Sequence, residues 1–197
     1  VFDGEGIFDG GGVGLSMPSG SSNGNSNVTI ENSTFTNGLI GGIQGYANYL
    51  TVRNSTFTNI SSGINHQGGG GNLVVEDSTF NVVAKSTGKN IYGIRFGSSS
   101  INNMSVVGSS FVVDSGGFTP DSGVYFASVI VRAVASGTLQ VENSSLISNV
   151  VNLSTTSLDA SPNWWGSMAG PATGQISGTV TFSPWCANEA CTAFLPN

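Results

Sequence analysis

Short stretches of alternating apolar and polar residues recur along the chain at a nearly regular spacing. Five nine-residue segments align without gaps, at 27–35, 49–57, 72–80, 103–111 and 138–146. In each segment the second and fourth residues are apolar, their neighbours vary, and a Phe or Leu ends the segment after small polar residues. Alternation with a period of two predicts β-strands that bury one face.

A second, weaker repeat lies between these segments and joins a glycine to a β-branched residue. Its members are Gly42-Ile43, Gly63-Ile64, Gly93-Ile94 and Gly123-Val124. The first repeat recurs at offsets of 22, 23, 31 and 35 residues. Because a unit of about 22 residues with two or three short strands cannot enclose a core alone, we expect the units to stack as coils with parallel strands. The longer offsets predict inserted loops.

Stacking turns every aligned position into a column that runs along the stack. One position is aromatic in four of the five segments, and its members are Phe35, Phe57, Phe80, Phe111 and Leu146. We expect this column inside, where stacked rings add geometry-specific attraction to the buried area. On the outside, Glu31, Arg53 and Glu76 align as an exposed ion-pair ladder, which contributes little to stability.

A polar position marks a bend in each unit. Asn or Asp occupies it in four segments and glycine in one, in the order Asn32, Asn54, Asp77, Gly108 and Asn143. Asn tolerates left-handed backbone at turns, and stacked amides can hydrogen-bond along the column. We therefore interpret the three Asn-Ser-Ser/Thr sequons at this position as part of an asparagine ladder.

Composition narrows the function classes. Charged residues make up 8% of the chain, the net charge is -6, and there are 29 glycines. A chain so rich in glycine is not mainly helical, and one with five basic residues lacks the footprint of a nucleic-acid binder. No apolar run approaches the roughly 20 residues that span a bilayer, so no membrane insertion is expected. Because the chain begins with Val1, we expect an upstream segment to have been removed or left out.

The coils resemble the right-handed parallel β-helix repeat of pectate-lyase-like proteins and of bacterial or archaeal surface proteins. The stretch Asn163-Trp-Trp-Gly166, followed by Pro184-Trp185, is similar to the closing segment of large secreted β-helix adhesins. The resemblance implies that Trp164, Trp165 and Trp185 cap the last coil as a hydrophobic plug. An aromatic platform for sugars is the alternative for these residues.

Repeat and resemblance together predict an all-β fold. We expect a single-stranded right-handed parallel β-helix, a solenoid of roughly seven coils, over residues 1–160. Insertions are expected near 81–102 and 112–137, and a C-terminal closing segment over 161–197.

Candidate catalytic chemistry is sparse. Polysaccharide-active β-helix enzymes need clustered carboxylates with a basic residue, or an Asp pair or trio for general acid and base work. The eleven acidic residues offer no such pair, and the single histidine, His66, precedes a glycine run in an expected loop, where it would be solvated. We therefore predict no catalytic residue, no cofactor and no enzyme activity. Asp3, Glu5 and Asp9 on a glycine-rich stretch are weak calcium candidates, and a first-coil turn explains them equally well.

Cysteines and sequons point outside the cell. Cys186 and Cys191 are expected to form a disulfide, which persists in oxidising compartments. Glycosylation candidates outside the asparagine ladder are Asn27, Asn59, Asn103 and Asn152. We expect an extracellular or cell-surface location.

These patterns favour a structural function: a self-associating β-helix subunit of a surface layer, sheath or filament, or an adhesin stalk. A homopolymer is expected, with residues 1–13 and the two insertions at its interfaces, since the insertions carry apolar residues such as Val129-Ile130-Val131 that a bare rod would expose. A domain excised from a longer adhesin is the rival reading. The alternative function is a β-helix that binds or cleaves polysaccharide, with a cell-surface polysaccharide as its partner.

Overall fold

The computed structural model describes residues 2–3, 12–17, 27–37, 40–66, 71–97 and 103–196. Within these ranges the chain forms strands, turns and bends, and no helix. The all-β expectation is therefore confirmed for the described residues.

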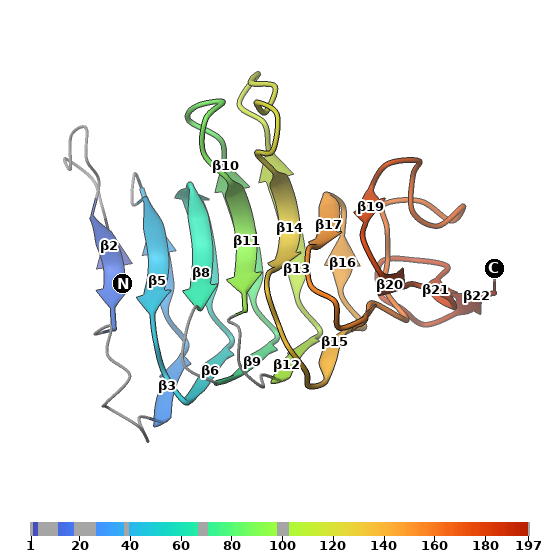
Figure 1. The fold of residues 1–197 in the computed structure, drawn as a ribbon, viewed down its shortest axis with the longest axis horizontal. Helices are drawn as coiled ribbons and strands as arrows, with labels where there is room; N and C mark the ends of the chain where they lie inside the picture. Colours follow the sequence, from blue (N-terminus) through green and yellow to red (C-terminus); the bar gives the residue numbers. More distant parts are fainter. Residues whose placement is uncertain are drawn as a thin grey trace.

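Three parallel sheets, which we name A, B and C, contain most of the strands (Figure 1). Sheet A consists of β1 (Phe2–Asp3), β4 (Thr34–Thr36), β7 (Thr56–Ile60), β10 (Thr79–Val83), β13 (Ser110–Asp114) and β16 (Ser145–Leu146). Sheet B consists of β2 (Val13–Ser16), β5 (Gly41–Gly45), β8 (Ser62–His66), β11 (Ile91–Phe96), β14 (Phe126–Val131), β17 (Asn149–Asn152) and β19 (Ile176–Ser177). Sheet C consists of β3 (Asn27–Glu31), β6 (Tyr49–Arg53), β9 (Asn72–Glu76), β12 (Asn103–Val107), β15 (Leu139–Glu142), β18 (Leu158–Asp159) and β20 (Val180–Thr181). The strands β21 (Trp185–Cys186) and β22 (Phe194–Leu195) form a separate antiparallel ribbon.

The chain visits the sheets in the repeating order A, B, C. Up to β18, each new strand pairs in parallel with the strand three elements earlier, as β7 with β4 and β10 with β7, and then β19 pairs with β17 and β20 with β18. We call one A–B–C passage a coil. Coils stacked in this way are compatible with a β-helix, and Figure 1 shows them following one another along the long axis.

The aromatic column confirms the register expected from the sequence. Phe35 pairs with Phe57, Phe57 with Phe80, and Phe80 with Phe111, and all four rings are fully buried. Their centroids lie 4.7, 4.6 and 4.7 Å apart, with interplanar angles of 3°, 5° and 3°. The rings therefore repeat at the spacing of neighbouring strands, so that each coil places its ring directly on the next.

Glycines on sheet B leave room for these rings. A Cβ atom on Gly42 would lie 2.5 Å from the Phe57 ring, and one on Gly63 would lie 2.6 Å from the Phe80 ring. At the aligned place in β14 stands Ser128, and there the following coil carries Leu146 rather than Phe. The weaker repeat thus reflects packing against the aromatic column.

One member of the weaker repeat was assigned wrongly from the sequence. Gly123-Val124 lies in the turn before β14, and the pair that aligns with Gly93-Ile94 is Ser128-Val129. Gly123 has a φ of 78° and open space around it, so glycine is favoured there by the backbone conformation of the turn and not by packing in the core.

The longer repeat offsets are due to loops between sheets A and B. Residues 84–90 join β10 to β11 and residues 115–125 join β13 to β14, and both loops project at the top of Figure 1. They are hydrogen-bonded to one another, from the Asp121 N–H to the Thr87 carbonyl at 3.2 Å and from the Tyr125 N–H to Asn90 Oδ1 at 2.8 Å. The inserted segments are therefore shorter than expected and brace each other.

The apolar run Val129-Ile130-Val131 does not belong to an insertion, contrary to the sequence-based expectation. It forms the end of β14, and none of the three residues is more than 1% exposed. Val129 and Val131 join the main core, while Ile130 packs on the outer face with Tyr92, Ala127 and Val151. This run therefore offers no free surface for lateral contact.

The bend between sheets C and A adopts left-handed backbone, as the column of Asn and Asp residues predicted. The φ angles are 50°, 46°, 47°, 61° and 50° at Asn32, Asn54, Asp77, Gly108 and Asn143. Asn, Asp and Gly are the residues that adopt this conformation at least cost, which explains the composition of the column.

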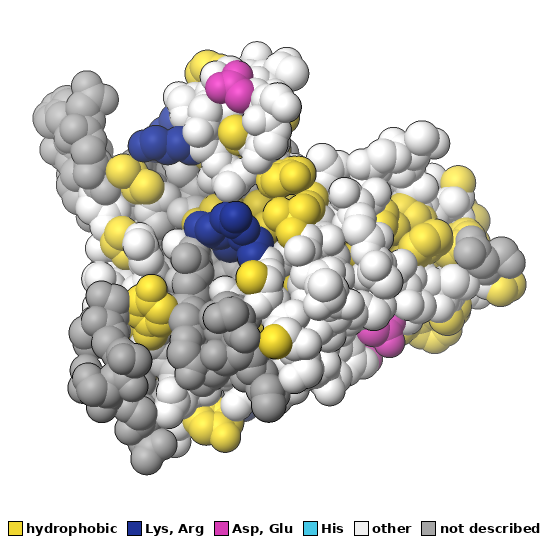
Figure 2. All heavy atoms as spheres, viewed as in Figure 1, with side chains coloured by type: hydrophobic (Ala, Val, Ile, Leu, Met, Phe, Trp, Pro, Cys, Tyr) yellow, Lys and Arg dark blue, Asp and Glu magenta, His cyan; other side chains and the backbone are white. Residues whose placement is uncertain are grey.

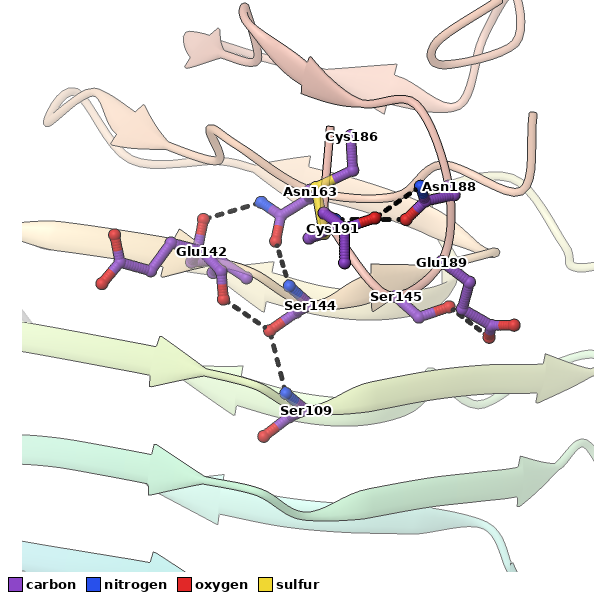
Figure 3. Close-up of a disulfide and its surroundings, with 11 residues drawn as sticks. Ser109, Glu142, Ser144, Ser145, Asn163, Cys186, Asn188, Glu189 and Cys191 are labelled. Atoms are coloured by element: carbon purple, nitrogen blue, oxygen red, sulfur yellow. Dashed lines mark hydrogen bonds between the residues drawn. A yellow bond between two sulfur atoms is a disulfide. The ribbon is translucent and has the colours of Figure 1, made fainter. Parts of the chain in front are cut away.

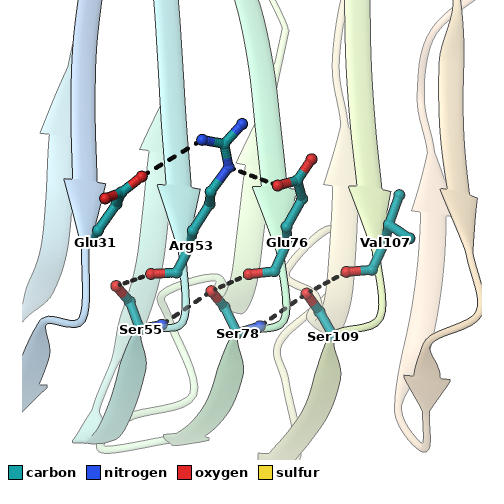
Figure 4. Close-up of polar contacts among 7 residues, drawn as sticks. All are labelled: Glu31, Arg53, Ser55, Glu76, Ser78, Val107 and Ser109. Atoms are coloured by element: carbon teal, nitrogen blue, oxygen red, sulfur yellow. Dashed lines mark hydrogen bonds and ion pairs between the residues drawn. The ribbon is translucent and has the colours of Figure 1, made fainter.

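The residue after each bend, a serine, carries the hydrogen-bond ladder along the stack (Figure 4). The N–H of Ser55 donates to Ser78 Oγ at 3.2 Å, that of Ser78 to Ser109 Oγ at 3.2 Å, and that of Ser109 to Ser144 Oγ at 3.1 Å. Each hydroxyl donates in turn to the carbonyl two residues earlier, as Ser78 does to Glu76 at 2.8 Å. Because these serines are 1–2% exposed, the ladder satisfies N–H groups that burial would otherwise leave unpaired.

Candidate functional site

The C-terminal end of the stack is closed by a polar side chain that continues the serine ladder. Asn163, which is fully buried, accepts a hydrogen bond from the Ser144 N–H at 2.9 Å and donates one to the Val141 carbonyl at 2.7 Å (Figure 3). Its amide therefore supplies both an acceptor and a donor, as the serine hydroxyls do in the earlier coils. This explains why an asparagine opens the Asn-Trp-Trp-Gly stretch.

The three tryptophans expected to cap the stack lie at this end. Trp164 forms a parallel bridge with Ser145, and this register places Trp165 on Leu146, at the end of the aromatic column. Trp165 is 3% exposed and meets the Phe182 ring edge-on at 6.5 Å, and the Phe182 ring lies 6.5 Å from that of Trp185. Trp164 and Trp185 are half-buried. Trp165 has no free face for a sugar, so the platform reading is wrong for this residue.

The tail contains a disulfide and is hydrogen-bonded to the last coil. Cys186 and Cys191 are bonded, as the sequence predicted. The Cys186 N–H donates to the Asn163 carbonyl at 2.9 Å, and Ser145 Oγ donates to Glu189 Oε1 at 3.1 Å (Figure 3). The tail is thereby held against the end of sheet A.

The N-terminal end of the described stack is more open. On β3 the core-facing Ile30 is 8% exposed and Val28 is only partly buried, whereas the aligned Val52 and Leu50 on β6 are fully buried. At the other end Leu158 on β18 is fully buried, while Val180 on the terminal strand β20 is only partly buried. The two ends differ in that Trp165, Phe182 and Trp185 pack together over the C-terminal coil.

Backbone donors of β3 point away from the stack. In the interior, outward-facing residues donate their N–H to the preceding coil, as Thr56 does to the Ser33 carbonyl at 2.8 Å and Asn72 to the Asn48 carbonyl at 2.7 Å. By the same alternation the N–H of the exposed Thr29 is directed away from β6. Among the described residues only β6 pairs with β3, so this strand is an edge that can accept another strand.

The charge ladder expected on the outside is present. Arg53 lies 2.6 Å from Glu76 and 3.4 Å from Glu31, and all three side chains are well exposed (Figure 4). The hydrogen bond from Arg53 to Glu76 raises the pKa of the guanidinium further above its ordinary value. Such an exposed ladder supports the register but contributes little stability.

The sequence suggested that His66 is a solvated loop residue, but in the structure it is buried. It ends β8, is 1% exposed, and stacks on Phe96 with ring centroids 5.6 Å apart. Its Nε2 lies 2.9 Å from the Ala47 carbonyl oxygen, to which the neutral ring donates. Burial lowers the pKa of His66 below its ordinary value. The glycine run after it misled the prediction, because the strand ends only at His66 itself.

Candidate metal ligands are not assembled in the described part of the chain. Glu5 and Asp9 lie outside the described residues, and only the backbone of Asp3 is placed, in β1. In the ranges that are described, no three His, Cys, Asp or Glu side chains gather as a metal site. No helix in those ranges has the length and apolar character needed to cross a bilayer.

The glycosylation candidates differ in accessibility. Asn27 and Asn59 are exposed. Asn103 is exposed too, but its amide donates to Asn72 Oδ1 at 2.7 Å and accepts from the Thr138 N–H at 2.8 Å. Asn152 is 3% exposed and its Nδ2 donates to the carbonyls of Thr156 and Thr179, so the folded chain has no room for a glycan there. Asn152 is therefore a wrong candidate.

One hollow lies beside the closing segment. It has a volume of about 480 Å³ and is lined by Ile147, Asn149, Trp165 and the loop of residues 166–175. Gln175 shapes it by donating to the Leu146 carbonyl at 2.9 Å and accepting from the Ala172 N–H at 2.8 Å. The lining is mixed, with neutral polar groups around an apolar floor.

Comparisons of the chain with models of protein families, with curated proteins and with solved structures found no match.

Proposed function

We propose that the chain is a right-handed parallel β-helix that serves outside the cell as a self-associating structural subunit of a surface layer, sheath, filament or adhesin stalk. Three parallel sheets visited in a fixed order support the β-helix, and parallel crossovers are almost always right-handed. The disulfide supports an oxidising, extracellular setting.

The difference between the two ends of the stack carries the proposal. The C-terminal coil is covered by Trp165 and by the disulfide-bonded tail, while β3 presents N–H donors that have no partner among the described residues, and Ile30 on it is 8% exposed. A strand from a second copy that paired with β3 would satisfy these donors and complete the burial of the core. Because the other end is covered, this pairing by itself joins two copies through their β3 edges, and a longer assembly needs a second contact.

Blocking the edge tests the proposal. Thr29→Pro removes an N–H that bonds nothing within the described chain, so the monomer should keep its circular dichroism spectrum and its thermal transition. Sedimentation and electron microscopy of the intact chain should show assemblies for the parent and for the control Thr29→Ala, and smaller particles for Thr29→Pro. A parent chain that stays monomeric at all concentrations contradicts the proposal.

A second candidate function is polysaccharide binding at the hollow beside Trp165. Ile147, which is 48% exposed, offers an apolar contact there, and Asn149, Ser167 and Thr173 offer neutral hydrogen-bonding groups. Such a mixture suits an uncharged sugar. Thr173→Trp, which fills the hollow, should abolish glycan retention on an affinity gel, and unchanged retention would exclude this site.

A further inference from the structure

Positive charge is concentrated on one side of the stack. The chain has five basic residues, and four of them lie on or beside β11 and β14. Lys85 and Lys89 belong to the loop before β11, Arg95 faces outward from β11, and Arg132 follows β14 directly. Figure 2 shows Lys and Arg side chains over the middle of this face, which is the outer face of sheet B. We call it the basic face.

No basic side chain of this face forms an ion pair with a described residue, although the exposed Asp121 lies on the neighbouring loop, which is hydrogen-bonded to the loop of Lys85 and Lys89. The ion pairs among described residues all belong to Arg53, on another sheet. Arg95 is the most constrained of the four, since its Nε is buried without a hydrogen-bond acceptor and it lies in register between Asn65 and Ile130. Because Nε is buried, a carboxylate that arrives from outside would meet the remaining N–H groups of this partly exposed guanidinium, in charge-assisted hydrogen bonds.

Negative charge is concentrated elsewhere, at the corner where sheet C gives way to sheet A. Glu31, Glu76 and Glu142 end strands β3, β9 and β15, and the exposed Asp77 follows in the turn. Arg53 is the single cation among the residues that end the sheet C strands. We call this the acidic corner.

The topology places the two regions on opposite sides of each coil. A coil has three corners, where sheet A meets B, where B meets C, and where C meets A. Sheet B takes part in the first two. The acidic corner is the third, which joins C to A and is therefore the one that sheet B does not touch. The cations belong to the two coils that contain β11 and β14, and the carboxylates on the opposite side belong to the coils that end in β3, β9 and β15.

We infer that stacked subunits pack side by side, with the acidic corner of one copy against the basic face of the next. This inference rests on the proposed self-association and adds a lateral contact to the edge contact at β3. Because the two surfaces differ, the contact is head-to-tail, and where the rotation between copies does not close a ring it extends the rods into a layer or bundle. It also places carboxylates near the unpaired guanidinium of Arg95 and offsets the repulsion of a chain with a net charge of -6.

Charge reversal tests the lateral contact in the Thr29→Pro background, where pairing at the β3 edge is blocked. Lys89→Glu/Arg132→Glu reverses two exposed charges of the basic face. Val107→Lys/Glu142→Lys adds one positive charge to the acidic corner and reverses one negative charge there. By sedimentation at low salt, each pair alone should lose at least about tenfold in association, and combining all four changes should restore it. Raising NaCl to about 0.5 M should weaken the parent contact by a similar factor, since the Debye length falls to a few Å.

Single substitutions of equal charge provide the matched control. Arg132→Gln and Asn81→Asp each lower the net charge by one, but Asn81 lies exposed on sheet A. Only Arg132→Gln should weaken association. The inference is overturned if salt and both reversals leave association unchanged, or if subunits stay separate and the basic face instead retains polygalacturonate, a carboxylated glycan. If the parent chain shows the salt-dependent lateral contact but no pairing at the β3 edge, the result would contradict the β3 contact of the proposed function and leave the lateral contact supported.

Discussion

Asn163 Oδ1 accepts the backbone N–H of Ser144 at 2.9 Å, taking the place that a serine hydroxyl holds in every earlier coil. The same amide donates to the Val141 carbonyl at 2.7 Å. One residue therefore ends a ladder that starts at Ser33 and satisfies the N–H of its last serine, Ser144. Closure of the stack depends on this side chain as well as on the tryptophans beside it.

Asn163→Ala should destabilise the chain by about 2–4 kcal/mol, because it leaves a buried N–H and a buried carbonyl without partners. Asn163→Ser restores an oxygen at the ladder position and should cost less. Chemical denaturation of both variants measures the difference. Equal losses for Ala and Ser would show that the volume of the side chain matters and its hydrogen bonds do not.

The middle of the aromatic column should be the most sensitive part of the core. Phe57 is fully buried between Phe35 and Phe80, so Phe57→Ala should cost about 3–5 kcal/mol. Val74 faces outward and is half-buried, so Val74→Ala should have a mild effect. Thermal denaturation of the two variants compares them, and similar losses would contradict the observed register, in which these residues face opposite ways.

The register could be predicted from the sequence because the repeat is gapless across both C and A strands. Leu50, Leu73 and Met104 align in the sheets as they do in the sequence, and so do the Phe residues. Sheet B was harder to predict, because its offset varies with the inserted loops, and Gly123 matched the pattern by chance. Its true counterpart, Ser128, breaks the Gly-Ile pattern. In that coil the aromatic column has Leu146 in place of a Phe, so the position opposite it need not be glycine.

The polar interior was only partly predictable. The asparagine column led correctly to a left-handed bend, yet the buried ladder runs through the neighbouring serines. A signal was present, since Ser33, Ser55, Ser78, Ser109 and Ser144 hold one aligned position in all five segments. Small polar residues at a strand end are usually exposed, but in the structure these serine side chains are buried, Ser33 only partly. The burial of His66 was hidden for a similar reason, because a glycine run follows it.

The disulfide should stabilise the tail more than the stack. It closes a loop with a sequence separation of 5, so its entropic contribution should be about 2 kcal/mol. Cys186→Ser/Cys191→Ser should therefore free the β21–β22 ribbon to proteolysis while the main thermal transition moves little. Thiol labelling of the unreduced chain checks the pairing itself, and two reactive thiols would contradict it.

Stability should fall as the pH drops below about 6.5, because His66 is buried in its neutral form. Burial lowers the folded-state pKa of His66 below the ordinary value of 6.5, so between these two values the unfolded chain binds more protons than the folded one. The contribution of the neutral ring is thus fully present above 6.5 and is lost as the pH falls through the lower folded pKa. Urea denaturation at pH 7, 6 and 5 should show a declining free energy of unfolding. His66→Gln keeps an N–H that can reach the Ala47 carbonyl but cannot titrate, so its profile over this range should be flatter. Parallel profiles for the parent and His66→Gln would mean that other groups govern the acid response of the stack.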